Sequence, residues 1–361
     1  MNTKPQNNDE SKGTDRSLYD PEPVAEEDLW FLPGQPEDVA PTDPPWPVAP
    51  REGSLHPEDW KKAERSQYQS LIKAVTALTR FHERLVGFPV ELRERFALKS
   101  VDAALRAEGV WLGVERIALY QALRVAGENE AQDLARASWA VRRLLSPQSD
   151  VADLRGFLGR VSVEDASVPG AEDRIVGEDL DQASAGLGEA MADIEAAHAL
   201  TRSAYLFAWW RREGITPWDE TLEPTIAAMI AGAGQGGFVL LSAGQRLDRY
   251  GLSGNEASVE KRLQAFYDAV EEGALEALLE IDRLRTWRER AGEATAELSG
   301  RTPPRLIDVL LRYPLVSAEL VAAEVGISGV SARRNLNLFV ERGLVREVTG
   351  QERFRFWAVA G

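Results

Sequence analysis

The sequence contains no cysteine, which excludes a disulfide framework, a thiolate zinc site and a cysteine nucleophile. Histidine is scarce, with three residues in 361. Basic residues are fewer than acidic ones: the sequence has 42 Lys and Arg and 58 Asp and Glu, which gives a formal net charge of −16. This balance argues against a protein that wraps nucleic acid, or lies on an anionic membrane, over most of its surface.

Long apolar runs are missing as well. The most apolar aromatic run, from Ala204 to Trp210, is seven residues long, whereas a membrane-spanning helix needs about 20. No apolar segment follows the lysines near the N-terminus, so we expect no signal peptide. We therefore expect a cytoplasmic protein that has no membrane partner.

Proline is concentrated at one end of the chain. Residues 1–57 hold eleven of the nineteen prolines, and this spacing leaves no room for a helix. The segment is acidic and carries sparse aromatic residues such as Trp30, Phe31 and Trp46. We expect a disordered arm, which is either a solvated tail or a segment that docks on the protein's own core or on a protein partner.

From residue 58 to residue 300 the apolar residues recur at three and four, which predicts an all-α helical body. Residues 58–147 form its first half, with helices that end near Gly109 and Pro147. Residues 148–178 are polar and turn-rich, so we expect a linker or loop there. In the second half, residues 179–300, a stripe runs from Met191 to Ala208, and a long helix is predicted from Glu256 to about Arg290. No strand-like alternation precedes residue 340.

Residues 303–361 carry the most specific pattern. Three short helices, the last two separated by a turn at Gly326, are followed by a segment of alternating residues. Ser317 and Ser328 stand where helix N-caps are needed. The order helix, helix, turn, helix, hairpin predicts a C-terminal winged helix-turn-helix with a small β-hairpin wing.

The exposed face of the second helix of this pair offers hydrogen-bonding groups for double-stranded DNA. Arginine can donate two parallel hydrogen bonds to guanine, and Ser and Asn can bond phosphates or base edges. In the predicted wing, two arginines alternate with phenylalanines and so share one face. The predicted DNA-binding residues are Ser328, Ser331, Arg333, Arg334, Asn337, Arg353 and Arg355.

The charge of this segment differs from that of the rest of the chain. Residues 301–361 hold nine Arg and six acidic residues, a net charge of +3, which leaves −19 for the remainder. A DNA-binding end on an acidic body is one interpretation. The alternative is an interaction or scaffold protein whose winged helix binds protein, because many winged helices serve as protein-interaction or dimerisation modules.

The segment LIDVLLRYPLVSAELVAAEVGISGVSARRNLNLFVERGLVREVTGQERFRFW resembles the C-terminal winged helix of Fic-family proteins. It is also similar to an uncharacterised bacterial helix-turn-helix family that is common in plant-associated bacteria. That second resemblance extends to DAALRAEGVWLGVERIALYQAL and DLARASWAVRRL in the body, and covers about residues 65–361. It implies DNA binding by the C-terminal domain and a helical domain without assigned activity.

The Fic resemblance also raises the hypothesis of a nucleotide-transferring enzyme. Fic enzymes transfer AMP with a motif that begins with His and runs through Phe to Gly-Asn-Gly-Arg. The three histidines are His56, His82 and His198, and none is followed by that pattern. We therefore expect no enzyme activity, no catalytic residues and no cofactor, and we keep a catalytically degenerate Fic-like protein as an alternative.

Two other sequence patterns could form ligand sites. The first pattern is the glycine spacing Gly-x-Gly-x-x-Gly, formed by Gly232, Gly234 and Gly237. A dinucleotide site with this spacing needs a strand before the first glycine. The residues before Gly232 follow a helical pattern instead. Trp209 and Arg212 could stack on a ligand, or Trp209 could pack between helices. The histidines lack the spacing of a metal site, so no metal is expected. The prediction is a DNA-binding regulator of transcription or of a replicon, whose helical body serves for dimerisation or sensing, and we expect a homodimer.

Overall fold

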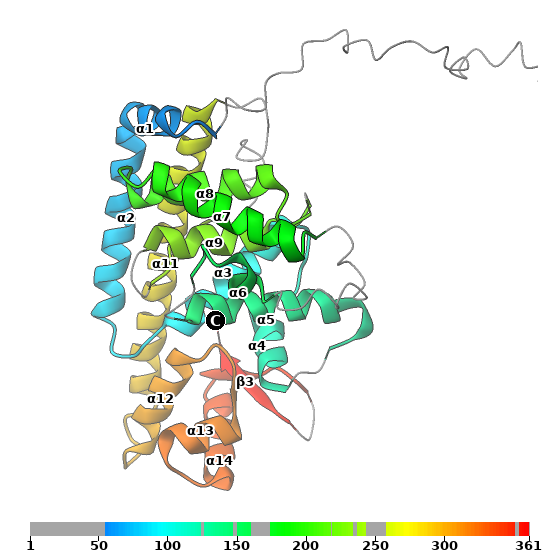
Figure 1. Ribbon diagram of the computed structural model, residues 1–361. Helices are drawn as coiled ribbons and strands as arrows, with labels where there is room; N and C mark the ends of the chain where they lie inside the picture. The colour runs from blue at the N-terminus through cyan, green and yellow to red at the C-terminus, as the bar shows by residue number, and fades with distance from the viewer. Residues whose placement is uncertain are drawn as a thin grey trace, which may run out of the picture. The chain divides into compact units, whose positions relative to one another are not determined.

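The computed structural model describes residues 55–123, 126–146, 150–159, 174–217, 219–233, 237–242, 258–350 and 354–360. Almost all of the expected disordered arm, residues 1–57, lies outside these ranges. The expected all-α body is confirmed (Figure 1). Its elements are α1 (Pro57–Ser66), α2 (Tyr68–Val86), α3 (Arg93–Ala107), α4 (Val114–Leu123), a 3-10 turn (Glu128–Glu130), α5 (Ala131–Leu145), α6 (Leu154–Leu158), α7 (Gly177–Asp193), α8 (Ala199–Glu213), α9 (Leu222–Ala233) and α11 (Val259–Ala294).

The second half of the body departs from its predicted helix pattern in one place. The stripe from Met191 to Ala208 suggested a single helix, but the chain breaks between α7 and α8. The break has a local cause, because Nδ1 of His198 accepts a hydrogen bond from the backbone N–H of Leu200 at 3.1 Å and so caps α8. The segment 148–178, expected to be a linker, contains the short helix α6.

The long helix α11 runs beside α2 over much of the body (Figure 1). Its 36 residues would extend about 54 Å at 1.5 Å per residue. On α2 the buried residues recur at three and four, and two of them, Ala74 and Ala77, are small. Short side chains on this face let the two helices approach closely along their length.

A non-helical segment, residues 237–242, packs directly onto α11. The N–H of Ser242 donates to the carbonyl of Ala269 at 2.8 Å. The contact is so close that a Cβ on Gly273 would lie 2.8 Å from the carbonyl oxygen of Leu240 and 2.7 Å from the nitrogen of Ser242. Glycine is therefore required at this position by backbone approach rather than by its own φ angle.

Replacing Gly273 with Ala should destabilise the protein by about 1–3 kcal/mol, because an added methyl group in a closed contact forces the backbone apart. Gly292→Ala is the matched control in the same helix, since a Cβ there meets no atom within 4 Å. That control should leave stability unchanged or raise it slightly. Urea unfolding followed by circular dichroism measures both, and equal midpoints for the two variants would contradict this account of the contact.

The C-terminal lobe, residues 302–360, contains the expected helix pair and hairpin. A three-stranded antiparallel sheet joins them, with strand order β1-β3-β2. In its register Val316 lies opposite Trp357, and Val345 lies opposite Val359. The elements are α12 (Thr302–Arg312), β1 (Val316–Ser317), α13 (Ala318–Val325), α14 (Gly329–Glu341), β2 (Val345–Glu347) and β3 (Phe356–Val359).

The expectation of no strand before residue 340 was wrong at β1. This strand has two residues, which is too short for any alternation to be visible in the sequence. It exists because β3 offers it a hydrogen-bonding edge far along the chain. Pro303 stands in the first turn of α12, where its missing N–H costs nothing.

One arginine of the body holds the lobe in place. Arg95 of α3 is 7% exposed, and its guanidinium donates to the carbonyls of Leu310 at 2.8 Å, Leu311 at 3.0 Å and Tyr313 at 3.1 Å. These carbonyls lie at the C-terminal end of α12, where helical carbonyls lack helical partners. Burial lowers the pKa of Arg95 to about 10, so the side chain stays charged at neutral pH.

The C-terminal end of α11 provides a second attachment. Nε1 of Trp287 donates to the carbonyl of Leu344 at 2.9 Å, just before β2. Arg342, at the end of α14, donates to the carbonyl of Ala294 and forms an ion pair with Glu297 at 2.7 Å. Residues 51–361 accordingly form one compact unit, and the orientation of α14 is tied to that of α11.

Replacing Arg95 with Met should cost about 2–4 kcal/mol of stability, because three buried carbonyls lose their charged donor. The exposed Arg80 of α2 provides the control variant Arg80→Met, for which no change is expected. Urea unfolding gives the free energies. If Arg95→Met unfolds at the same midpoint as Arg80→Met, the guanidinium does not hold the lobe on the body.

Candidate nucleic-acid interface

The turn between α13 and α14 is shaped by the capping residues that the sequence predicts. The hydroxyl of Ser317 accepts from the N–H of Leu320 at 3.1 Å and starts α13. Gly326 ends that helix with a φ of 77°, in the left-handed region that favours glycine. The hydroxyl of Ser328 then accepts from the N–H of Ser331 at 3.2 Å and starts α14. All three predicted signals are confirmed.

Helix α14 has one buried and one exposed face. Ala332, Leu336 and Phe339 are fully buried in the core of the lobe. Arg333 and Arg334 lie on the opposite side and are exposed. Neither forms an ion pair or hydrogen bond with another residue in the described part of the chain. Two unneutralised guanidiniums are therefore free to meet an anionic or hydrogen-bond-accepting partner.

Other arginines of the lobe are engaged within the protein. Arg312 pairs with Glu324 at 3.0 Å, and Arg346 of β2 pairs with Glu115 of α4 in the body. The guanidinium of Arg305 donates to the carbonyl of Val325 at 3.2 Å. The net charge of +3 therefore overstates the positive charge that a partner could contact. Arg333 and Arg334 on α14 are among the arginines that remain available for such a contact.

The polar residues predicted for DNA contact are placed less uniformly. Ser328 is exposed, and although its oxygen accepts a capping hydrogen bond, its own O–H can still donate. Ser331 and Asn337 are half-buried on α14. The carbonyl of Ser331 accepts from Nδ2 of Asn335 at 2.8 Å, which holds that amide along the helix.

Arg355 of the hairpin is engaged within the protein. Nε of Arg355 donates to Glu347 at 2.8 Å, and its guanidinium lies 5.3 Å from the centre of the Trp357 ring. The hydrogen bond to Glu347 raises the pKa of Arg355. Glu347 lies on the neighbouring strand, a partner that alternation within one strand cannot reveal. Arg353 lies outside the described residues.

Residues 303–360 match the sequence model of a family described as an HTH DNA binding domain. The C-terminal lobe is therefore a helix-turn-helix DNA-binding domain. No curated protein matches the chain. Among solved structures, the chain is similar to a Fic family protein from Desulfovibrio desulfuricans G20, with 14% identity, a TM-score of 0.38, and coverage of 81% of this chain and 96% of that chain. A likeness at this level supports no statement about chemistry.

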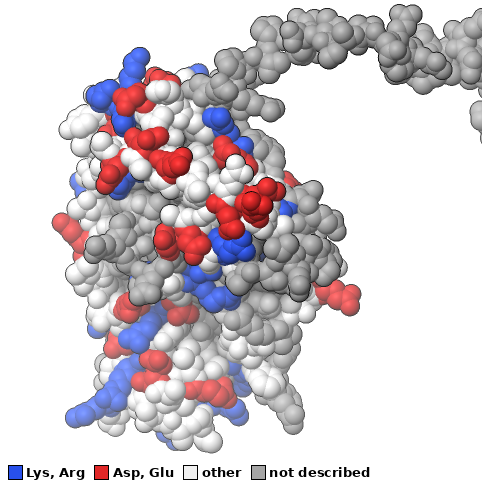
Figure 2. Space-filling model, viewed as in Figure 1, with Lys and Arg blue, Asp and Glu red and all other residues white. Residues whose placement is uncertain are grey.

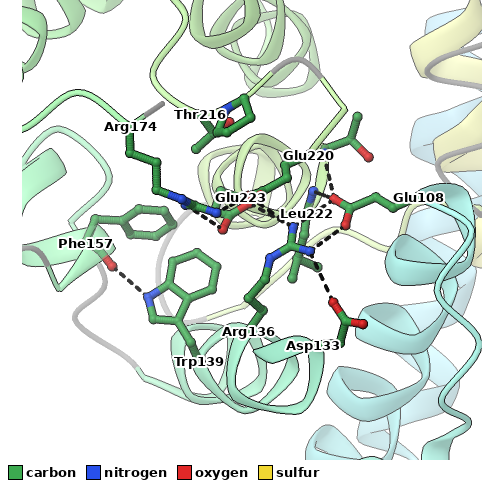
Figure 3. Close-up of polar contacts among 12 residues, drawn as sticks. Glu108, Asp133, Arg136, Trp139, Phe157, Arg174, Thr216, Glu220, Leu222 and Glu223 are labelled. Atoms are coloured by element: carbon green, nitrogen blue, oxygen red, sulfur yellow. Dashed lines mark hydrogen bonds and ion pairs between the residues drawn. The ribbon is translucent and has the colours of Figure 1, made fainter. Parts of the chain in front are cut away.

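The body contains a largely buried ionic cluster that sequence reasoning missed (Figure 3). Arg136 of α5 lies at its centre and pairs with Glu108 at 2.9 Å, Glu220 at 3.4 Å and Glu223 at 3.4 Å. Arg174 pairs with the same Glu220 and with Glu223. These residues are spread over more than a hundred positions of the sequence, so no spacing rule could have grouped them.

The cluster fixes the start of α9. A carboxylate oxygen of Glu108 accepts from the backbone N–H groups of Thr221 and Leu222, each at 2.5 Å. Burial alone would lower the pKa of Arg136, but the carboxylates of Glu223 and Glu108 outweigh it and raise that pKa. The guanidinium therefore stays charged, and the arrangement is a helix-anchoring network.

The glycine-rich segment does not have the setting of a dinucleotide site. The element before it is helix α9 rather than a strand. A Cβ on Gly232 would lie 2.9 Å from the side chain of Val239 and 3.0 Å from that of Ser203, so this glycine serves packing. Gly234 lies outside the described residues, and Gly237 is the first residue of the described segment 237–242.

The remaining candidates have structural contacts. Trp209 is 8% exposed in the core, whereas Arg212 pairs with Glu213 at 3.8 Å on the surface, so the two do not form a stacking pocket. Partial desolvation lowers the pKa of His82, whose side chain is exposed on α2. Among the described residues, no group of three His, Cys, Asp or Glu could hold a metal ion. Within those same residues, no helix has the length and apolarity needed to cross a membrane.

Replacing Arg136 with Met should lower the free energy of unfolding by about 3–5 kcal/mol, because the carboxylate of Glu108 would remain buried without a counter-charge. Adding Glu108→Gln to that variant should restore part of the loss, since the carboxylate left without its ion-pair partner is then neutral. Arg65→Met, at an exposed position on α1, is the control. A double variant less stable than Arg136→Met alone would argue against a charge-based role.

Proposed function

We propose that this protein is a sequence-specific, double-stranded DNA-binding regulator of transcription or of a replicon. The observation that carries the proposal is the pair Arg333 and Arg334, exposed and unpaired among the described residues on α14. In helix-turn-helix domains the second helix of the motif enters the major groove. An arginine there can donate two hydrogen bonds to guanine O6 and N7.

The charge distribution supports contact through the lobe alone. In Figure 2 acidic and basic side chains are interspersed over the body, and at the lower end of the view Lys and Arg side chains project beside acidic ones. Outside residues 301–361 the sequence carries a net charge of −19, which repels phosphate. Such a molecule would bind DNA end-on, with a small footprint and a modest salt dependence.

The hairpin of β2 and β3 is the proposed wing, which makes the lobe a winged helix-turn-helix. Because Arg355 is held by Glu347, the wing's contact with DNA would depend on Arg353, which lies outside the described residues. We also retain membership of the uncharacterised bacterial helix-turn-helix family as part of the proposal.

We assign dimerisation to the body. Leu275 and Leu279 lie about one turn apart on α11 and are 44% and 61% exposed. Two neighbouring apolar side chains on the same side of the helix therefore face solvent. A two-fold dimer would place two copies of α14 on half-sites about one helical turn of DNA apart. The N-terminal arm, outside the described residues, is the proposed contact for a protein partner.

The test begins with selection of a preferred duplex from random DNA by the intact chain, followed by anisotropy titrations. Arg333→Ala combined with Arg334→Ala should weaken binding to the selected duplex by at least about tenfold, since each good base contact contributes about 1–3 kcal/mol. If the two arginines contact bases rather than phosphates, the dependence of the affinity on salt concentration should stay close to that of the native protein.

The matched control is Arg65→Ala combined with Arg80→Ala, which removes the same charge from exposed positions of the body. Equal losses in the two double variants would mean that only net charge matters. If no duplex is preferred, and pull-downs instead yield nuclease-resistant protein partners, the protein serves as an interaction module and the proposal is wrong.

A further inference from the structure

The exposed face of α14 also carries an apolar side chain. Val330, in the first turn of the helix, is 83% exposed. Arg333 and Arg334 follow it by three and four residues, and Asn337 follows by seven, so all four share one side of the helix. The buried face of α14 is already complete, and Val330 has no part in it.

A single exposed valine is common on protein surfaces, but its neighbour gives a second, independent observation. Gly329 is the first residue of α14, and its φ lies outside the left-handed region. A Cβ at this position would meet no atom of the protein within 4 Å. The fold therefore does not require glycine here, although glycine weakens a helix relative to alanine.

A bare backbone at the start of a recognition helix permits close approach to another molecule. The N-terminal residues of that helix are the ones that reach base edges in helix-turn-helix complexes. The apolar group that a base edge offers in the major groove is the C5 methyl of thymine. A β-branched side chain, with its few rotamers, is a suitable surface for that methyl group.

We propose that Val330 packs against the methyl group of a thymine, and that Gly329 lets the start of α14 come close enough to the duplex for this contact. The inference rests on the proposed function and adds a specificity-determining residue to it. Three or four helical residues rise about 4.5–6 Å, which is one to two base-pair steps of about 3.4 Å. The thymine therefore lies within one or two base pairs of the base that Arg333 or Arg334 contacts.

The experiment uses the intact chain and the preferred duplex found by selection. Each thymine is replaced in turn by deoxyuridine, which lacks the methyl group and keeps the base pair. The native protein should bind one such duplex about fourfold more weakly, the loss expected for one buried methyl group. Val330→Ala should bind the thymine and uracil duplexes equally well.

Val86→Ala is the matched control, because Val86 on α2 is 87% exposed and far along the chain from the interface. It should keep the native preference for thymine. Gly329→Ala should lower affinity for every duplex alike while leaving the thermal unfolding midpoint unchanged or higher, which separates a DNA contact from a folding defect.

The outcomes distinguish this inference from the proposed function. If the native protein selects a duplex but no thymine-to-uracil change alters its affinity, the methyl contact is wrong and the DNA-binding function stands. A Val330→Ala variant that keeps the full thymine preference has the same meaning. If no duplex is selected at all, the proposed function fails and the contact fails with it.

Discussion

The guanidinium of Arg95 is the constraint on which the arrangement of this protein depends. It comes from the body, and the carbonyls that it satisfies are those that end the first helix of the DNA-binding domain. The helix therefore ends on a charge supplied by another part of the chain. The domain is therefore not flexibly tethered to the body. Its orientation relative to the body is set by the fold.

Arginine serves two opposite purposes in the same chain. Arg136 lies enclosed by carboxylates, where it offsets their burial and anchors α9. Arg333 and Arg334 lie in solvent, where no described residue competes for them. Total charge cannot distinguish the two cases, because both count equally toward the sum. The distinction depends on which surfaces fold against one another, and it explains how an acidic protein can present a cationic helix.

The sequence predicted features that are encoded locally. Helical spacing located the body helices, and the capping residues Ser317 and Ser328 marked both helices of the motif because a cap needs only residues within one turn. What it missed depends on distant partners. The strand β1 exists through β3, and the ion pair of Arg355 depends on Glu347 across the sheet. The break at His198 was hidden because the apolar stripe continued through it.

The ionic cluster and the exposure of Val330 belong to the same class of features. Carboxylates that converge from α3 and α9 on α5 leave no spacing signal. An exposed valine looks, in the sequence, like any other apolar residue on a helix, and only packing shows that the buried face has no need of it. Sequence patterns thus located the candidate site, whereas its composition required the fold.

The continuity of α11 limits how this chain can change in length. Gly273 fixes the helix against the body, and Trp287, fourteen positions later, bonds to the lobe. Inserting one residue between them would turn the tryptophan by about 100° and advance it by about 1.5 Å, away from its acceptor. Insertions of nearly whole turns would preserve the rotation but shift the lobe along the axis. This stretch of helix therefore acts as a fixed spacer, and natural variants should differ in its side chains rather than in its number of residues.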